Sequence, residues 1–318
     1  MTLESLSGIA FFDPRHTMVQ LFSFAALAAA FATSAVAVDP AALYDGGFGN
    51  AINPQALLRI GNGGAGQSGL VKALADAFIQ DRAANGSTPF LVAWYTSDTT
   101  YSIKYLQTGV TDVAITYNPA AEQIAIDQGI ASPPSYYIFR DHFLLVGPPS
   151  NPARISNSSS VLALISALHE AAEKGNSNPP VRFLSRFDKS ATNIKESLLW
   201  LGTGQVPWAT AYSAWYHQYI AFPIQALTAA ILLQEYTLTD RGTYLSLPEE
   251  LRSRTVVYKA GTDDEADLLL NPGRLLIGEK AENKATARVF AEWLVGNAGQ
   301  DVIRGFKKGG ERLYSPAP

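Results

Sequence analysis

The sequence of 318 residues contains no cysteine. Without a thiol, disulfides, zinc–thiolate sites, iron–sulfur clusters and a cysteine nucleophile are all excluded. The four histidines lie far apart in the sequence and form no HExxH-type pair, so we expect neither a bound metal nor a cofactor. His142 falls in an apolar run typical of a strand, and we expect it to have a structural role.

Charge is also scarce, at 16% of the residues, with a net charge of −4 and no long basic run. This composition argues against binding to nucleic acid, which requires a basic surface. Hydrophobic residues make up 47% of the chain. At this length, we expect two domains of moderate size, each with its own core.

The N-terminal residues 1–37 have the features of a leader and signal peptide. An apolar stretch at 21–32 is followed by Ala35-Val36-Ala37, a small-x-small cleavage pattern, so we expect cleavage near Ala37 and a secreted, extracellular protein. The stretch is short for a membrane span. Translation starts at Met1 or Met18, and we favour Met18. Asn85 and Asn157 begin glycosylation sequons, which predict a glycoprotein.

Strands alternate with helices along most of the mature chain, which predicts an α/β fold. Residues 38–56 are predicted to be irregular. The predicted strands are 57–60, 90–95, 112–116, 136–146, 181–184, 255–258 and 275–278. The predicted helices are 68–81, a segment after 96–100 that runs through Leu106 and Gly109, 122–128, 160–174, one or two within 210–234, 286–294 and 299–306.

Residues 181–200 (VRFLSRFDKSATNIKESLLW) read as a strand, a loop with an arginine, and the start of a helix. Asp188, Ser190 and Thr192 are candidate helix caps. A helix N-terminus offers unpaired backbone N–H groups and a partial positive charge. Arg186 adds a planar set of donors suited to a tetrahedral oxyanion. The pattern therefore favours binding of a small anion, although an ordinary βα junction with a surface arginine is the alternative.

Three loops share this form, at 61–69, 96–100 and 185–192: each follows a strand, is rich in Gly, Ser or Thr, and begins a helix. Ligands of open α/β sheets bind at such positions. The candidate ligand-binding residues are Ser68, Gly69, Ser97, Thr99, Thr100, Ser185, Arg186, Ser190 and Thr192.

The glycine-rich loop at 61–69 matches no nucleotide-binding motif, because it lacks a Walker A lysine and the acidic residue of a dinucleotide site. It also lacks the second glycine of a GxSxG nucleophile elbow. We expect either a backbone nest, whose N–H groups at 64–69 can donate to an anion, or a flexible loop. A nucleophilic serine here is the less favoured alternative.

Five segments resemble the tungstate-binding proteins of ABC importers, a family with the type II periplasmic-binding-protein fold. SRFDKSATNIKE at 185–196 resembles the family's SRGDxSGTxxKE, and YTLTDRGTYL at 236–245 is similar to its motif almost letter for letter. DHFLLVGP at 141–148, Asn271-Pro272 and AEWLVGNAG at 291–299 also follow its pattern. The resemblance covers residues 57–318, and the signal peptide and sequons are those of a divergent, fungal-like member.

The resemblance implies two lobes, each a mixed sheet flanked by helices, which are joined by two crossing strands near 143–147 and 273–278. Lobe 1 would comprise residues 38–145 and 270–318, and lobe 2 residues 146–269. A small oxyanion would bind between the lobes, and a membrane transporter would be the partner. We expect a monomer.

The first loop departs from the family, whose TTTS motif is replaced by residues 62–69, where only Ser68 remains in register. This departure predicts weaker binding or a different ligand. Our first hypothesis is a solute-binding protein for a tungstate- or molybdate-like oxyanion. An extracellular interaction protein with an altered anion site is the alternative. An enzyme that uses the same cleft is a third possibility, but no nucleophile–base pair is evident and we expect no catalytic residues.

Overall fold

The computed structural model describes residues 38–49, 55–209 and 212–318. The predictions about the signal peptide, the start at Met18 and cleavage near Ala37 concern residues outside these ranges. Residues Asp39–Pro318 form one compact unit, and none of the helices in the described residues is long and apolar enough to cross a membrane.

One end of this unit is built around four strands. They are β1 (Ala42–Tyr44), β2 (Ala56–Asn62), β3 (Leu91–Thr96) and β4 (Val113–Thr116), in the spatial order β1-β3-β2-β4. The strand β2 runs parallel to both β3 and β4, as expected where helices connect successive strands. The helices of this lobe are α2 (Gly64–Ser68), α3 (Leu70–Ala84), α4 (Thr99–Thr108), α5 (Pro119–Asp127), α11 (Lys284–Val295) and α12 (Asn297–Gly305).

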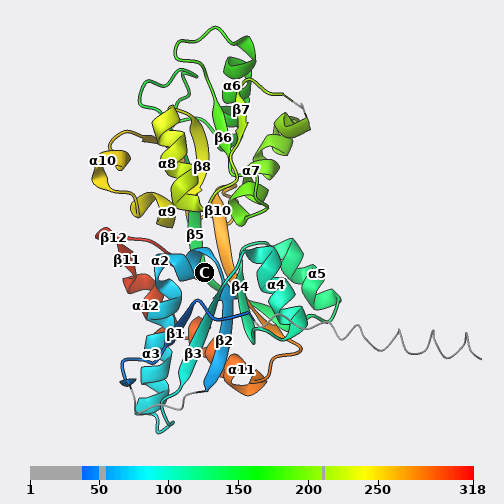
Figure 1. Cartoon of the computed structure of the whole chain (residues 1–318), viewed down its shortest axis with the longest axis vertical. Helices are drawn as coiled ribbons and strands as arrows, with labels where there is room; N and C mark the ends of the chain where they lie inside the picture. The colour runs from blue at the N-terminus through cyan, green and yellow to red at the C-terminus, as the bar shows by residue number, and fades with distance from the viewer. Residues whose placement is uncertain (1–37, 50–54, 210–211) are drawn as a thin grey trace, which may run out of the picture. The chain divides into compact units, whose positions relative to one another are not determined.

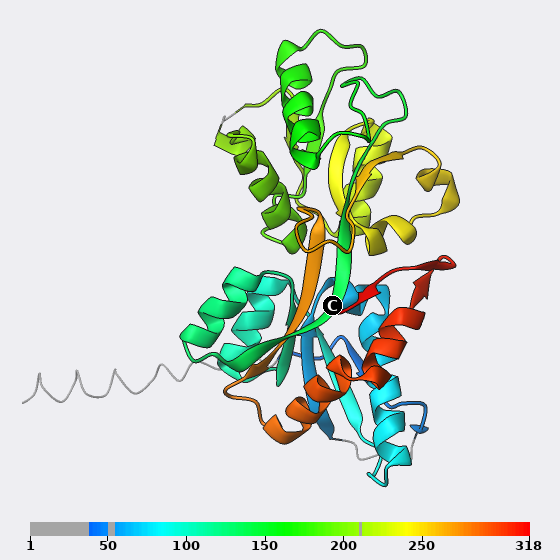
Figure 2. The same cartoon turned by 180° about the vertical axis from the view of Figure 1, so that it is seen from behind.

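Two long strands, β5 (Ala131–Gly147) and β10 (Leu270–Gly278), run from this lobe into the second one (Figures 1 and 2). They pair with each other in antiparallel fashion, with Asn271 opposite Asp141. From Phe143 onwards, β5 instead pairs with β8 (Tyr236–Asp240) and β9 (Val256–Ala260). The change of partners within one strand makes β5 common to both lobes.

The second lobe continues the sheet from β8 through β6 (Phe183–Ser185) to β7 (Tyr216–Gln218). Its helices are α6 (Val161–Lys174), α7 (Ala191–Gly202), α8 (Pro223–Leu233), α9 (Arg241–Leu245) and α10 (Glu249–Arg252), with a 3₁₀ turn at Pro207–Ala209. The chain ends with the short strands β11 (Lys307–Lys308), β12 (Glu311–Arg312) and β13 (Ser315–Pro316), of which β13 pairs with β5 in the first lobe.

The structure differs from the sequence-based elements in three places. The predicted irregular residues 38–56 contain the strand β1, and the predicted helix at 68–81 is divided into α2 and α3 by Gly69, whose φ of 96° is left-handed. The region 210–234 holds β7 and then α8. The reason is that Pro223 fixes the helix start, while Tyr216 packs its ring in a strand against Phe183.

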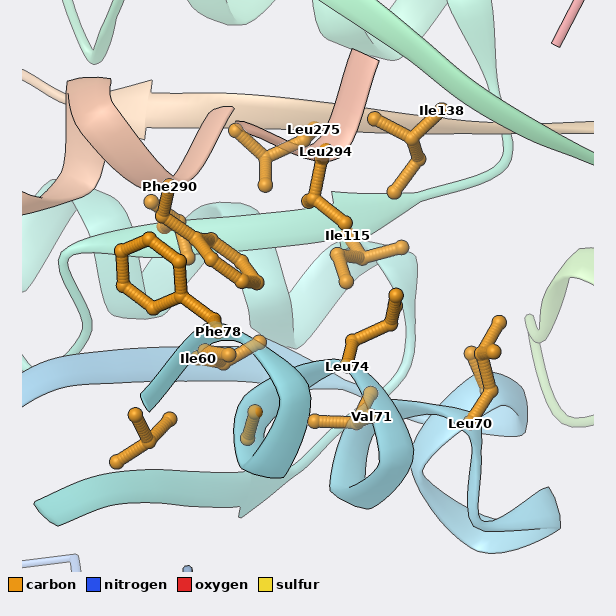
Figure 3. Packing of buried hydrophobic residues seen from close by; sticks show 14 of the residues in the cluster. Ile60, Leu70, Val71, Leu74, Phe78, Ile115, Ile138, Leu275, Phe290 and Leu294 are labelled. Atoms are coloured by element: carbon orange, nitrogen blue, oxygen red, sulfur yellow. The ribbon is translucent and has the colours of Figure 1, made fainter. Parts of the chain in front are cut away.

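Each lobe has its own hydrophobic core. In the first, helices α3, α11 and α12 pack on one face of the sheet (Figure 3), while α4 and α5 contribute to a smaller cluster with Ala114 and Leu276. In the second, the fully buried Trp200 packs edge-on against Phe183 and lies next to Trp215. The two lobes thus have separate hydrophobic cores.

Phe78 is the centre of the first core, where its ring packs against Phe90 and Phe290 with centroid distances of 5.9 and 5.0 Å. We expect Phe78→Ala to lower the free energy of unfolding by about 3–5 kcal/mol, because it leaves a cavity in a rigid core. Urea unfolding measures this change. Val289→Ala, on the exposed face of α11, is the control and should change stability by less than about 0.5 kcal/mol; a similar loss in both variants would contradict the assignment.

Candidate functional site

A cavity of about 930 Å³ lies between the lobes. Its walls come from the loops after β2, β3 and β6, from the segment between β7 and α8, from the start of α9, and from β5 and β10. These loops follow the carboxyl ends of strands, which is where α/β folds place their ligands.

Arg186 enters this cavity from the loop between β6 and α7, and its side chain is only 11% exposed. The guanidinium donates to the Thr192 hydroxyl over 3.5 Å and pairs with the Asp188 carboxylate, while Nε donates to the carbonyl of Ala221 over 3.4 Å. The Thr192 and Ala221 contacts are at the long limit for hydrogen bonds. A better acceptor in the cavity could therefore replace them.

The backbone of this loop is unusual. Phe187 and Lys189 have φ values of 47° and 61°, a left-handed conformation that costs a residue with a side chain roughly 1–2 kcal/mol. Ser190 caps α7 by accepting from the N–H of Asn193 over 3.3 Å, and Asp188 accepts from the N–H of Ser190 over 3.0 Å. The glycine that the family motif has at position 187 would adopt this conformation without strain.

A buried carboxylate outside the cavity wall holds the start of this loop in place. Glu196 accepts hydrogen bonds from Ser185 Oγ and the Tyr216 hydroxyl, both over 2.7 Å, and from Trp200 Nε1 over 3.3 Å. Burial raises the pKa of Glu196 to about 7, although these three donors oppose the shift. Ser185 is therefore committed to this network and is absent from the cavity wall.

Thr99 is the first residue of α4 and lines the same cavity from the opposite lobe. Its side chain is 5% exposed, and its hydroxyl has no hydrogen-bond partner within the described part of the chain. Its neighbour Ser97 also lines the cavity but shares a hydrogen bond with Ser102 at 2.7 Å. A buried hydroxyl without a partner is costly unless a ligand completes it.

The glycine-rich first loop uses most of its donors internally. The N–H of Ala65 donates to the Tyr117 hydroxyl over 3.1 Å and that of Gly66 to Asn62 Oδ1 over 2.7 Å. The N–H groups of Gln67 and Gly69 donate to carbonyls within the loop. The expected nest of free N–H groups at 64–69 is therefore wrong for these four residues. Two of the N–H groups donate to Tyr117 and Asn62, and the other two donate to carbonyls of the loop itself.

Close packing explains why two positions of the first loop are glycine. A Cβ atom on Gly66 would lie 2.2 Å from the ring of Trp94, and one on Gly63 would lie 2.4 Å from the carbonyl oxygen of Ser97. Gly64 is different, since the nearest atom to its Cβ would be the Tyr117 hydroxyl oxygen at 3.6 Å. A hydroxyl side chain fits only at position 64 of these three.

Ser68 lines the cavity, but its hydroxyl already contacts the carbonyl of Ala65 at 3.0 Å and the Tyr314 hydroxyl at 2.9 Å. Of the nine residues predicted from the sequence, the structure brings six to the cavity wall: Ser68, Ser97, Thr99, Arg186, Ser190 and Thr192. The remaining three lie outside the wall: Gly69 separates α2 from α3, Thr100 is exposed, and Ser185 is buried on Glu196.

Sequence reasoning missed the polar residues on the central strands. Asp141 and Asn271 line the cavity and bond to each other over 3.0 Å, and Asp240 and Tyr117 lie in the same wall. The signal was present, because Asp141, Asp240 and Asn271 all fall in segments that carry the family resemblance. The next residue, His142, bonds through Nε2 to Asp263 over 2.9 Å, and no cluster of three or more metal-ligating side chains occurs within residues 38–49, 55–209 and 212–318.

Comparison with known proteins gives three findings. Residues 49–298 match the family model of the PBP superfamily domain. The chain is 64% identical to a solved protein described as a "periplasmic putative metal binding protein", with 84% of this chain and 98% of that chain covered and a TM-score of 0.81. It is 27% identical over 248 residues to the "Tungstate-binding protein TupA" of Peptoclostridium acidaminophilum, covering 73% of this chain and 81% of the relative.

A further relative is the "Putative ABC transporter anion-binding protein" of Haloferax volcanii, which is 27% identical over 219 residues. The match covers 68% of this chain and spans 60% of that relative's length. These relatives are thus described as binding a metal, tungstate and an anion.

The strained loop gives a testable prediction about Phe187. We expect Phe187→Gly to be more stable than Phe187→Ala by about 1 kcal/mol, because only glycine adopts a φ of 47° without strain. Comparing the two truncations removes the common loss of the ring, and chemical denaturation measures the difference. Equal stability of the two variants would show that the loop relaxes.

Proposed function

This chain belongs to the PBP superfamily, and from that premise we propose that it is a solute-binding protein that closes its two lobes on a small oxyanion such as tungstate or molybdate. Its α/β architecture confirms the predicted two-lobed periplasmic-binding-protein fold. A metal oxyanion fits the descriptions of all three relatives, because it contains a metal and is also an anion.

One observation carries the proposal: the buried Thr99 hydroxyl without a partner faces the same cavity as Arg186. An oxyanion would accept from Thr99 in one lobe and from Arg186 and Thr192 in the other. Charge-assisted hydrogen bonds of this kind are the strong ones in proteins. A ligand that bridges both lobes in this way stabilises the closed form by its differential affinity.

The location and partner belong to the same proposal. We infer export with cleavage near Ala37, a monomeric mature protein and delivery of the anion to a membrane transporter. Similar proteins are periplasmic or belong to ABC transporters by name. The side chains of Asn85 and Asn157 are exposed, which is compatible with glycosylation if the host performs it.

One prediction concerns Arg186. We expect Arg186→Ala to weaken molybdate binding by more than about 100-fold, because a charge-assisted contact in a largely buried wall is worth roughly 3 kcal/mol. Isothermal titration calorimetry measures the affinity. Arg182→Ala is the matched control, since Arg182 is exposed and lies outside this cavity, and it should bind like the wild type. An unchanged affinity of Arg186→Ala would remove this residue from the site.

Titration with tungstate, molybdate, sulfate and phosphate tests the function itself. We expect the two metal oxyanions to bind, with lower affinity than in relatives that keep a hydroxyl-rich first loop. No binding of any oxyanion would overturn the proposal and favour the alternative of an interaction protein with an altered anion site.

A further prediction concerns the glycines of the first loop. Gly64→Ser should tighten oxyanion binding by about 2- to 10-fold, since it adds one hydroxyl donor to the cavity wall at about 0.5–1.5 kcal/mol. Gly66→Ser carries the same change two residues away, where the side chain collides with Trp94. This variant should instead lose stability in thermal unfolding. Similar behaviour of the two variants would show that packing against Trp94 does not determine the loop sequence.

A further inference from the structure

Four carboxylates line the cavity: Asp98, Asp141, Asp188 and Asp240. A negative charge repels an anionic ligand, so each of these carboxylates needs a nearby group that stabilises its charge. Asp98 and Asp240 cap helices, where they accept from the N–H groups of Tyr101 and Thr243, both over 2.8 Å. Asp188 pairs with Arg186. Helix N-termini and a guanidinium are environments that stabilise a negative charge.

Asp141 lacks such compensation. It is 5% exposed, and its two oxygens accept from the N–H of His142 over 2.8 Å and from the Asn271 amide over 3.0 Å. Within the described ranges it makes no ion pair. Neutral donors alone stabilise a buried charge less than a cation would.

The neighbours of Asp141 add a second negative charge. Phe143 pairs with Asp240 across β5 and β8, and because side chains alternate along a strand, Asp141 is on the same face as Asp240. The other titratable groups that act on or respond to this carboxyl are the partly buried Tyr117, the buried Tyr314, Arg241 and the adjacent His142. Burial of the two tyrosines keeps them neutral at ordinary pH.

Two carboxyls on the same face of one cavity wall repel each other when both are ionised. Asp240 caps α9, where the N–H of Thr243 donates to it. Burial, followed by the charge of Asp240, raises the pKa of Asp141 to about 8, against 3.8 for an ordinary aspartate. A carboxyl that keeps its proton at neutral pH can donate a hydrogen bond, whereas an ionised one can only accept.

We propose that Asp141 is a specificity-determining residue of the oxyanion site, in which its protonated carboxyl donates a hydrogen bond to a fully deprotonated oxyanion. This inference rests on the proposed function. Once Asp141 ionises, it becomes an acceptor and repels an anion that has only acceptors. Hydrogen phosphate carries a proton of its own and can donate to the ionised carboxylate, so it should be affected less than molybdate.

The test is calorimetric titration of the purified full-length protein with molybdate between pH 6.5 and 9.5 at constant ionic strength. We expect the wild-type affinity to be level at the lower end and to fall towards tenfold per pH unit above about 8. Asp141→Asn, whose amide remains a neutral donor, should bind without this fall. A level wild-type affinity for molybdate, or the same fall in Asp141→Asn, would overturn the proposal.

Glu122→Gln is the matched control. Glu122 is a buried carboxyl whose pKa is also raised by burial, but it lies outside the cavity. This variant should keep the wild-type dependence on pH. If it loses that dependence as well, the effect belongs to general stability and the role of Asp141 is refuted.

Thermal unfolding without any anion gives an independent measurement. Because the folded-state pKa is raised, ionised Asp141 destabilises the fold, and this cost grows between pH 4 and about 8 and is complete above it. The melting temperature of the wild type should therefore fall relative to that of Asp141→Asn over this interval. A constant difference contradicts the proposal.

Molybdate binding that is independent of pH refutes only the role of Asp141, whereas no oxyanion binding at any pH refutes the proposed function as well.

Discussion

The antiparallel pair of β5 and β10 is the constraint on which the rest of the structure depends. The two strands are the shared part of both lobes, and β5 changes its partners between His142 and Phe143, from β10 to β8 and β9. Asp141 and Asn271 stand opposite each other next to this change. The loops that follow strands in either lobe consequently line one cavity. Asp141 and Asn271 line it too, so part of its polar wall belongs to the strands that connect the lobes.

The site is supported by residues that lie outside the cavity wall. In the second lobe, Glu196 fixes the end of β6 and the strand β7 through three hydrogen bonds, which offset part of the cost of burying its charge. In the first lobe, Trp94 covers Gly66 and donates through Nε1 to the carbonyl of Asn62 over 2.9 Å. The positions of Arg186 and Thr99 therefore depend on packing in each lobe as much as on their own loops.

The sequence predicts those parts of the site that local pattern controls. The loop that carries Arg186, Ser190 and Thr192 follows an apolar strand and leads into a helix. Their common position can therefore be predicted without knowledge of the fold. Asp141 and Asn271 could not, because they are 130 residues apart and meet only through strand pairing. The first loop was misread for a similar reason: its glycines resembled a flexible nest, whereas Trp94 and Tyr117, distant in sequence, determine both its packing and its hydrogen bonds. In the region 210–234, Tyr216 belongs to the strand β7 and not to a helix.

The balance of charge in the cavity limits how an oxyanion can be bound. Arg186 is shared with Asp188, and helix starts hold Asp98 and Asp240, so the wall offers little net positive charge. Recognition must then depend on donors that carry no charge in addition to Arg186, such as the Thr99 hydroxyl and an acid that keeps its proton. Such donors distinguish ligands by where they accept hydrogen bonds and not by charge alone. A site of this kind gains selectivity at the expense of affinity, and each hydroxyl lost from the first loop reduces the number of donors that a tetrahedral ligand can find.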